Sequence, residues 1–278
     1  MKEKKLKRLV KGYIYLDRIK RLPSSYDTIG HVAIIEVPRE LQKHKKTIAK
    51  ALMETNKKIE TVLEKRSSRK GKYRTREYVV LAGKKKTETV HKEYGCTFKL
   101  DPTKVYFSPR ELTERQRIAE QVKPNEIVMV MFSGIAPYAI QIAKKQPKVK
   151  KVLSIEINPI AHKYALENIR VNKVSHKVIA IKGDVNDVCK PWFRKCNRVL
   201  MPLPTESHNF LELAMKCVRK NGIIHFYTVW NESDPFINLR NFIKRILKGK
   251  RRYKVIRIRK VLPYAPRKLK VCVDLKVI

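Results

Sequence analysis

The strongest constraint on the fold is an alternation of apolar strands and amphipathic helices that fills most of the chain after about residue 104. Strands are predicted over residues 127–132, 151–156, 177–181, 198–201 and 222–229, and helices over 137–145, 159–172, 206–219 and 235–247. This order is typical of a mostly parallel sheet covered by helices on both faces. Two final apolar runs, 253–261 and 269–277, have no helix between them, so we expect them to pair antiparallel.

The first part of the chain has a different pattern. An apolar run over residues 31–37 ends at Pro38 and predicts a buried strand, and helical spacing of apolar residues predicts a helix over 40–63. Further strands are predicted over residues 76–82, 87–91 and 97–100, which together predict a small sheet. We therefore expect a small α+β domain over residues 1–103 and an α/β domain with a Rossmann-like sheet over 104–278.

The charge of the chain points to a polyanionic partner. Lys and Arg number 65 against 25 Asp and Glu, a net charge of +40. Such self-repulsion is relieved by a nucleic acid, which we expect as the partner. No apolar run approaches the roughly 20 residues that a membrane-spanning helix needs, and no apolar signal region follows the basic start. We expect a cytoplasmic, monomeric protein that does not contact a membrane.

The cysteines and histidines predict no metal site. None of the five cysteines forms a C-x-x-C pair, so we expect buried thiols in a reducing compartment. His162, His176, His208 and His225 show no ligand spacing with one another.

The turns after three predicted strands carry the residues of a cofactor site. The first turn, Phe132 to Pro137, contains one glycine, Gly134, which is too few for the G-x-G-x-x-G pattern of a dinucleotide site. It leaves room for the methionyl tail of S-adenosylmethionine. Glu156 ends the next strand and can accept hydrogen bonds from ribose hydroxyls, and Asp184 follows the third strand and can accept from an adenine amino group. Each acid alone is more often a cap or turn residue; their succession at strand ends favours S-adenosylmethionine.

Several segments together resemble one family. They are Tyr106-Phe107-Ser108-Pro109-Arg110 with Glu114 and Arg115 behind it, the loop Met131 to Tyr138, Glu156-Ile157-Asn158-Pro159, Met201-Pro202-Leu203-Pro204, Leu22 to Asp27, and Tyr264-Ala265-Pro266-Arg267. The set is similar to the archaeal and eukaryotic tRNA (guanosine-37, N1)-methyltransferases, including their wyosine-pathway branch. The resemblance implies methylation of the base next to the anticodon, and a smaller domain that helps to hold the anticodon arm.

The resemblance also implies roles for individual residues. Glu114 would be the general base, and Arg110 could stabilise charge on the O6 atom of guanine. The cofactor would contact Arg115, Phe132, Gly134, Glu156, Ile157, Asp184 and Val185. The substrate would contact Tyr106, Pro202 and Pro204, and Arg74 and Arg76 could touch a phosphate or the base. Without the resemblance, Glu114 would be a helix-face partner of Arg110 or Arg117, and Arg74 and Arg76 would serve solubility.

Three departures from the family pattern bear on specificity. Val130 stands where the family usually has Asp, and Ala136 replaces the second glycine of its G-x-G. Pro202 replaces the Asn of the common Asn-Leu-Pro motif. This proline version resembles the branch of the family that methylates C7 of 4-demethylwyosine. The family's usual N-terminal domain has no counterpart here, so we expect tRNA selection to differ. The alternatives are a non-catalytic RNA-binding protein with a relic fold, or a methyltransferase acting on another RNA or on a protein.

Overall fold

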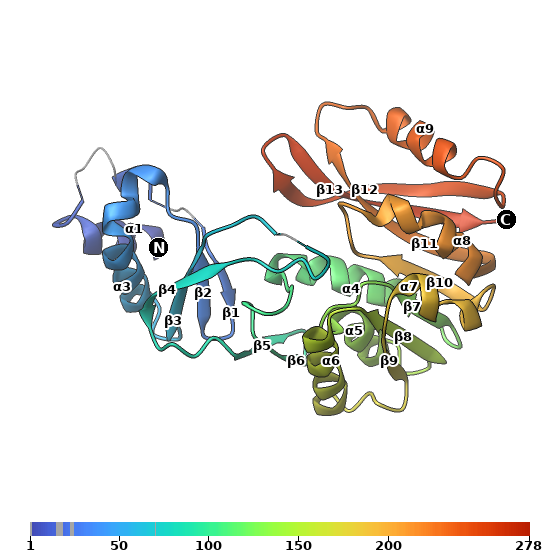
Figure 1. Cartoon of the computed structure of the whole chain (residues 1–278), viewed down its shortest axis with the longest axis horizontal. Helices are drawn as coiled ribbons and strands as arrows, with labels where there is room; N and C mark the ends of the chain where they lie inside the picture. Colours follow the sequence, from blue (N-terminus) through green and yellow to red (C-terminus); the bar gives the residue numbers. More distant parts are fainter. Residues whose placement is uncertain (1, 15–18, 23–24, 70) are drawn as a thin grey trace. The chain divides into compact units, whose positions relative to one another are not determined.

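The computed structural model describes residues 2–14, 19–22, 25–69 and 71–278 (Figure 1). Pro23 and Ser24 of the predicted N-terminal motif, and Lys70 of the basic stretch, lie outside the described residues. The chain forms two compact units, Met1–Pro109 and Arg110–Ile278, and each is described on its own.

The second unit is built on a seven-stranded sheet with the strand order β12-β13-β11-β10-β7-β8-β9. The strands are β7 (Ile127–Val130), β8 (Lys151–Glu156), β9 (Val178–Lys182), β10 (Cys196–Met201), β11 (Val218–Asn231), β12 (Tyr253–Ala265) and β13 (Lys268–Val277). Strands β7 to β11 are parallel to one another, whereas β13 is antiparallel to both β11 and β12. The predicted fold class is therefore confirmed, including the antiparallel C-terminal pair.

Helices and short helical turns precede the first strand of this sheet and connect the later ones. They are η2 (Pro109–Glu111), α4 (Leu112–Gln121), α5 (Pro137–Lys145), α6 (Pro159–Val171), α7 (Val185–Val188), η3 (Lys190–Trp192), η4 (Ser207–Phe210), α8 (Leu211–Cys217) and α9 (Phe236–Ile246). Helices α5 and α6 contact β8 and β9, and α8 contacts β10 and β11. The core between these elements is apolar and closed to solvent, with Met129, Leu153, Val199 and Phe226 fully buried.

One helix of the second unit is shorter than the prediction over residues 206–219. It begins as the turn η4, continues as α8, and ends at Cys217. Val218 already has extended backbone angles and starts β11, four residues before the predicted stop at Gly222. The helix ends early because Val218 pairs with Cys196 of β10. This strand pairing takes Val218 out of the helix before the stop signal at Gly222 is reached.

The first unit contains helices α1 (Lys2–Val10) and α3 (Lys45–Thr55), the turn η1 (Arg39–His44) and two sheets. The four-stranded sheet joins β1 (Asp27–Ile29), β2 (Val32–Ile35), β3 (Thr61–Lys65) and β4 (Tyr78–Gly83) in that order. Strands β5 (Thr89–Glu93) and β6 (Cys96–Leu100) form a separate hairpin. The predicted strands therefore form, although the last two pair with each other and do not complete the larger sheet.

The predicted helix over residues 40–63 is wrong in its second half. Helix α3 ends at Thr55, Asn56 is extended, and Thr61–Lys65 forms β3, which pairs in parallel with β2. Ile59 and Leu63 fit a helical spacing, but both are buried here as parts of an extended segment. The β-branched pair Thr61 and Val62 favours the strand, and both residues are fully buried in it.

Two further sequence predictions concern side chains and the membrane. All five cysteines are buried and unbridged. Among the described helices, none combines the length and the apolar character that a bilayer crossing requires.

A pair of glycine substitutions tests the packing of the first unit. Gly83 and Gly95 both have positive φ, of 85° and 69°, so Ala at either costs about 1–2 kcal/mol in backbone strain. A Cβ at Gly83 would also lie 2.0 Å from the carbonyl oxygen of Glu60, whereas a Cβ at Gly95 meets no atom within 4 Å. We expect Gly83→Ala to accelerate hydrogen exchange in β3 and β4 clearly more than Gly95→Ala does in β5 and β6. Equal effects would contradict this packing.

Candidate active site

The loop after β7 is held in a conformation that few sequences adopt. Phe132, Gly134 and Ala136 all have positive φ, of 56°, 57° and 67°. For Phe132 and Ala136 this costs about 1–2 kcal/mol each, a strain that is tolerated where the surrounding structure fixes the backbone. Here the amide of Ser133 donates to the carbonyl of Ile155 over 2.8 Å, and the Ser154 hydroxyl donates to the Ser133 Oγ over 2.7 Å, so β8 fixes the loop.

Glu156, at the carboxyl end of β8, clamps the same loop. Its Oε2 accepts from the amide of Gly134 over 2.6 Å, and its Oε1 accepts from the amide of Asn158 over 2.7 Å. The residue is 9% exposed, and burial raises the pKa of its carboxyl although these backbone amides act in the opposite direction. Glu156, predicted to accept from the ribose, therefore holds the loop in this structure. Each carboxylate oxygen has more than one lone pair, so the clamp does not exclude a ligand contact.

The neighbouring strand ends are closed by helix caps. The Asn158 side chain accepts from the amide of Ile160 over 2.9 Å and starts α6, with Pro159 in its first turn. Asp184 starts α7, and its Oδ1 accepts from the amide of Asn186 over 3.0 Å. Asp184 is therefore a helix-cap residue, as the alternative interpretation of the sequence suggested. Because this contact uses one oxygen, a cap does not exclude a ligand contact.

Glu114 is buried on α4 and occupied by side-chain partners. Both of its oxygens accept from Arg117, over 2.8 Å from Nε and 2.6 Å from Nη2, and Oε1 also accepts from the Tyr227 hydroxyl over 2.6 Å. The Nε atom of Arg259 lies 3.9 Å from Oε2. The helix-face pairing with Arg117 that the sequence offered as the alternative is thus formed. Tyr227, which the sequence did not single out, joins this carboxylate to β11.

Arg115 and Glu111 are buried on the same helix region. Arg115 is 2% exposed, and its charge acts on Tyr138 of α5. Glu111 forms a 2.8 Å ion pair with Lys270 of β13, which is also buried. Arg110 precedes them and is exposed. The Tyr138 and Tyr227 rings are 6.3 Å apart, so the Glu114 region and the start of α5, which follows the loop, are neighbours.

A buried polar network continues from Arg117 into the sheet. Arg117 Nη1 lies 3.6 Å from Asp274 of β13, and Asp274 shares a 2.6 Å hydrogen bond with His225 of β11. On its other side His225 contacts Arg198 of β10 over 2.7 Å, and Arg198 pairs with Glu126 over 3.0 Å. Sequence analysis missed this network. The sequence does place polar residues inside apolar strands at His225 and Asp274, and this pattern could have indicated a buried network. In the structure His225 pairs with Asp274, and Tyr227 with Cys272, in the register of β11 and β13.

The side chains of His225, Cys272 and Asp274 place their donor atoms within 4.8 Å of one another, as ligands of a metal ion do. These atoms already bond among themselves, since Asp274 Oδ1 also accepts from the Cys272 thiol over 3.4 Å. The guanidinium groups of Arg117 and Arg198 adjoin them. Two positive charges at this distance oppose a cation, so the donor set fits a hydrogen-bond network better than a metal ion.

The loop after β10, which carries Pro202 and Pro204, is attached to β11. The carbonyl of Pro204 accepts from the amide of Val229 over 3.1 Å, and the Ser207 hydroxyl donates to the carbonyl of Tyr227. Phe210, just behind this loop, packs edge-on against Phe132 with 4.9 Å between ring centroids. The predicted substrate loop and the predicted cofactor loop are therefore in contact through two aromatic rings.

Comparison with known proteins identifies the family. Residues 89–256 match the TRM5/TYW2 methyltransferase domain, and residues 6–87 match the TYW2 N-terminal domain. The chain belongs to the TRM5/TYW2 methyltransferase family. It is 40% identical over 92% of its length to the tRNA (guanine(37)-N(1))-methyltransferase Trm5b of Pyrococcus abyssi, covering 76% of that protein.

Other members of the family carry out a different transfer. The chain is 36% identical to the tRNA(Phe) (4-demethylwyosine(37)-C(7)) aminocarboxypropyltransferase of Methanocaldococcus jannaschii, over 90% of this chain and 97% of that protein. Among solved structures, Pyrococcus horikoshii TYW2 in complex with MeSAdo superposes with a TM-score of 0.83 at 31% identity, covering 99% of both chains. A complex of aTrm5 and tRNALeu superposes with a TM-score of 0.86 at 33% identity, covering 100% of this chain and 79% of that one.

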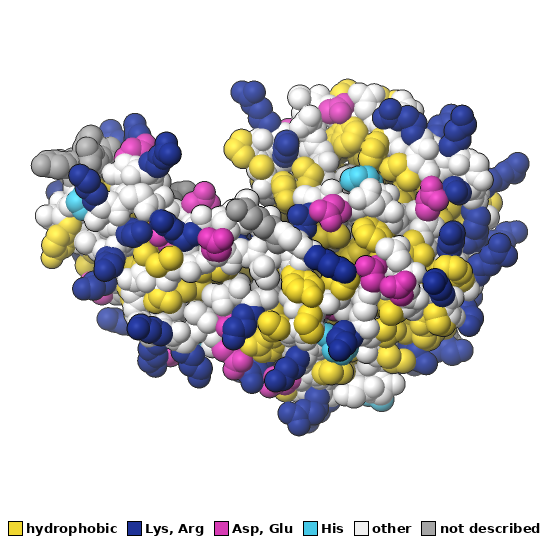
Figure 2. Space-filling view, in the orientation of Figure 1, with side chains coloured by type: hydrophobic (Ala, Val, Ile, Leu, Met, Phe, Trp, Pro, Cys, Tyr) yellow, Lys and Arg dark blue, Asp and Glu magenta, His cyan; other side chains and the backbone are white. Residues whose placement is uncertain are grey.

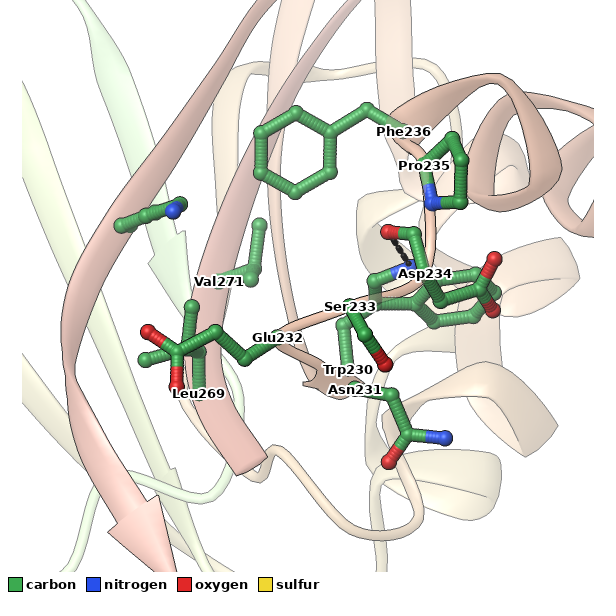
Figure 3. A pocket seen from close by; sticks show the side chains of 10 residues that line it. Trp230, Asn231, Glu232, Ser233, Asp234, Pro235, Phe236, Leu269 and Val271 are labelled. Atoms are coloured by element: carbon green, nitrogen blue, oxygen red, sulfur yellow. Dashed lines mark hydrogen bonds between the residues drawn. The ribbon is translucent and has the colours of Figure 1, made fainter. Parts of the chain in front are cut away.

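A cavity of about 200 Å³ lies at the carboxyl end of β11 (Figure 3). Trp230, Phe236 and Val271 contribute apolar side chains, and Glu232 and Asp234 contribute carboxylates. The Trp230 indole is fixed by donating to the carbonyl of Asp234 over 3.1 Å. Lys260 lines the same cavity, so charged groups of both signs stand beside its apolar walls.

The remaining predicted substrate residues of this family member belong to the first unit. Arg74 has a positive φ of 54°, and Arg76 lies two residues before β4 and acts electrostatically on Tyr78. The guanidinium of Arg69 stacks over the Tyr106 ring at 3.9 Å from its centroid. Both predicted arginines are half-buried in a strongly basic segment.

The clamp formed by Glu156 can be tested without substrate. Hydrogen bonds to a charged acceptor contribute about 1.5–3 kcal/mol, so Glu156→Ala should accelerate hydrogen exchange at the amides of Gly134 and Asn158 about tenfold or more. Asp184→Ala is the matched control and should affect the amide of Asn186 alone. The unmodified protein should show the same loosening at low pH, because protonation of Glu156 weakens the clamp. Since the pKa of Glu156 is raised, this loosening should begin at a higher pH than the protonation of an ordinary carboxyl. Unchanged exchange at Gly134 would contradict the clamp.

Proposed function

We propose that this chain transfers a methyl group from S-adenosylmethionine to the base at position 37 of tRNA, next to the anticodon. The observation that carries the proposal is the Glu114 carboxylate, which is held by Arg117 and Tyr227 in the same unit as the clamped loop after β7. A proton acceptor and a site for a methionine-derived cofactor are what methylation at guanine N1 requires. Membership of the family and the Trm5b relatives support the same reaction.

An RNA substrate is supported by where the charges lie. Among the residues whose burial is described, eight acidic side chains are buried against three basic ones; the acids are Glu64, Glu93, Asp101, Glu111, Glu114, Glu126, Glu156 and Asp274, and the bases are Arg115, Arg198 and Lys270. Because the interior takes more acids than bases, the exterior is more positive than the net charge of +40 indicates. Figure 2 shows Lys and Arg side chains spread over the visible face of both units. Such a surface attracts the phosphates of RNA.

The strand-end residues fit the cofactor. Glu156 offers acceptors for the ribose hydroxyls and Asp184 for the adenine amino group, and Ile157 and Val185 beside them supply apolar contact with the base. The backbone of Phe132 and Gly134 would pass along the methionyl tail, and Arg115 would neutralise its carboxylate. Bound S-adenosylmethionine supplies the transferable carbon as a substituent of a sulfonium.

Glu114 supplies the proton acceptor. Guanine N1 carries a proton at neutral pH, and this proton would move to the carboxylate as the new bond to N1 forms. Arg110 would stabilise the charge that grows on O6. The loop with Pro202 and Pro204, attached to β11 at Val229, would position the base. The smaller domain predicted over residues 1–103, with Arg74, Arg76 and Tyr106, would hold the anticodon arm.

A second candidate is supported by the comparisons. The match to the TYW2 N-terminal domain, and the alignment over 97% of the Methanocaldococcus jannaschii aminocarboxypropyltransferase, favour the transfer of an aminocarboxypropyl group to C7 of 4-demethylwyosine. A third relative is a tRNA 4-demethylwyosine(37)-methyltransferase of Saccharolobus solfataricus, which is 37% identical over 76% of this chain. Its name states that it methylates the same nucleoside. Both reactions can use the same residues of this chain around the cofactor.

Mass spectrometry of tRNA nucleosides distinguishes these reactions. The chain should be incubated with S-adenosylmethionine and either unmodified tRNA or tRNA that contains 4-demethylwyosine. We expect N1-methylguanosine from the first substrate and a methylated nucleoside from the second, because one site accepts both bases. If the second substrate instead gains the mass of an aminocarboxypropyl group, the chain carries out the second candidate reaction and not methylation. No product with either tRNA, from protein that binds the cofactor, would contradict the proposed function.

Glu114→Gln tests the proton acceptor. The amide retains the size of the side chain but cannot accept the proton, so turnover should fall about 10²–10⁴-fold while cofactor affinity by calorimetry stays unchanged. Glu120→Gln is the matched control, because Glu120 lies on the same helix and is exposed. Full turnover by Glu114→Gln would remove this residue from the reaction.

A further inference from the structure

The buried network beyond Arg117 contains none of the residues proposed to bind cofactor or base, yet it contacts the proposed proton acceptor. Arg117 touches Glu114 with two nitrogens and faces Asp274 with the third, 3.6 Å away. Its Nη2 also lies 3.4 Å from the Cys272 sulfur. One guanidinium is therefore shared between two buried carboxylates, and whatever fixes Asp274 also affects the charge that Glu114 experiences.

The hydrogen bonds around Asp274 define which proton His225 carries. Arg198 can only donate, so the Nε2 atom of His225, 2.7 Å away, must accept. The ring proton then lies on Nδ1 and is donated to Asp274 Oδ1 over 2.6 Å. Burial lowers the pKa of His225, which keeps the ring neutral in this arrangement. Asp274 thus accepts a neutral hydrogen bond on one oxygen and faces the Arg117 charge with the other.

The other ionisable groups around Glu114 hold their protonation state near neutral pH. Burial raises the pKa of Tyr227 on β11 and of Tyr138 on α5 well above their ordinary value, so both stay protonated. Burial also raises the pKa of the Cys272 thiol on β13. The Arg259 Nε atom on β12 lies 3.9 Å from Glu114 Oε2.

Asp274 stays ionised in the same range. Burial alone would raise the pKa of its carboxyl, but the hydrogen bond from His225 and the charge of Arg117 outweigh burial and bring it below its ordinary value. A negative charge therefore faces Arg117 throughout the range in which Glu114 would work.

We propose that Asp274 is a positioning residue for Glu114, which it keeps basic by sharing the Arg117 guanidinium. The inference rests on the proposed function, in which Glu114 takes the proton from the base. A guanidinium committed wholly to Glu114 would stabilise its ionised form and weaken it as a base. Asp274 draws part of that charge away, and His225 holds Asp274 in place. The proton moves only from the base to Glu114, and neither Asp274 nor Arg117 exchanges one.

The test is the pH dependence of kcat for methyl transfer in three variants. Asp274→Asn keeps size and can still accept from His225, but it leaves Arg117 to Glu114 alone. We expect the acid limb of the profile to move about one pH unit lower and the plateau to fall several-fold, with KM for S-adenosylmethionine unchanged. Glu126→Gln is the matched control, because it removes the same charge at the far end of the network and should leave the limb in place.

Arg117→Lys should shift the acid limb of the pH profile in the opposite direction, and it provides the test if Asp274→Asn fails to fold. An ammonium cannot hold both Glu114 oxygens as the planar guanidinium does, so the limb should move to higher pH. Asp274→Asn added to Arg117→Lys should then cause less shift than it does alone, because the two residues act in series. A limb that stays in place in Asp274→Asn, or moves equally in Glu126→Gln, would overturn the inference.

A readout without turnover separates this inference from the proposed function. In protein labelled at glutamate carboxyl carbons, the Glu114 resonance is identified by its loss in Glu114→Gln. Its titration midpoint should be lower in Asp274→Asn than in the unmodified chain. If the unmodified chain transfers no group to tRNA, the proposed function fails, while the midpoint still decides whether Asp274 acts on Glu114. An equal midpoint in both proteins overturns the inference alone.

Discussion

The buried ion pair of Glu114 and Arg117 joins α4 to the sheet, because Glu114 accepts from Tyr227 of β11 and Arg117 faces Asp274 of β13. A carboxylate that is 4% exposed is costly to bury unless its partners replace the lost water, and here two guanidinium nitrogens and a phenol do so. Glu111 at the start of the helix needs Lys270 for the same reason. Helix α4 also packs against α5 and buries Ile118 and Ala119. Polar residues of β11 and β13 therefore act together with these apolar contacts in holding the helix.

The two carboxylates of the site differ in what surrounds them, and this difference separates their roles. Glu156 accepts from the backbone amides of Gly134 and Asn158, and burial raises the pKa of its carboxyl. Glu114 has the Arg117 cation at bonding distance and the Arg259 cation nearby. Backbone dipoles hold a loop in one shape, whereas a shared cation sets how readily a carboxylate accepts a proton. One residue type thus serves a structural clamp and a proposed proton acceptor within one unit.

The parts of the structure that follow local rules could be predicted from the sequence. The alternation of strands and helices, the cap at Asp184 and the turn around Gly134 each depend on residues close together in the chain. The second half of the predicted helix over 40–63 failed because pairing with β2 outweighs a coincidental helical spacing. The network could not be predicted, because His225 and Asp274 meet only through the register of β11 with β13, and Asp274 reaches Glu114 only through Arg117. A single slip of that register would send His225 and Asp274 to opposite faces.

The division between the loops and the network bears on how one family accommodates two transfers. A base that takes a proton is useful whichever carbon of the sulfonium is attacked, so the contacts of Glu114 do not select between a methyl and an aminocarboxypropyl group. That selection requires the methionyl tail to lie differently. In this chain the tail would pass the strained backbone of Phe132 and Ala136, and Phe132 packs against Phe210 behind the proline loop. Differences in reaction within the family should therefore follow residues 132–137 and 202–210, where loop shape is set.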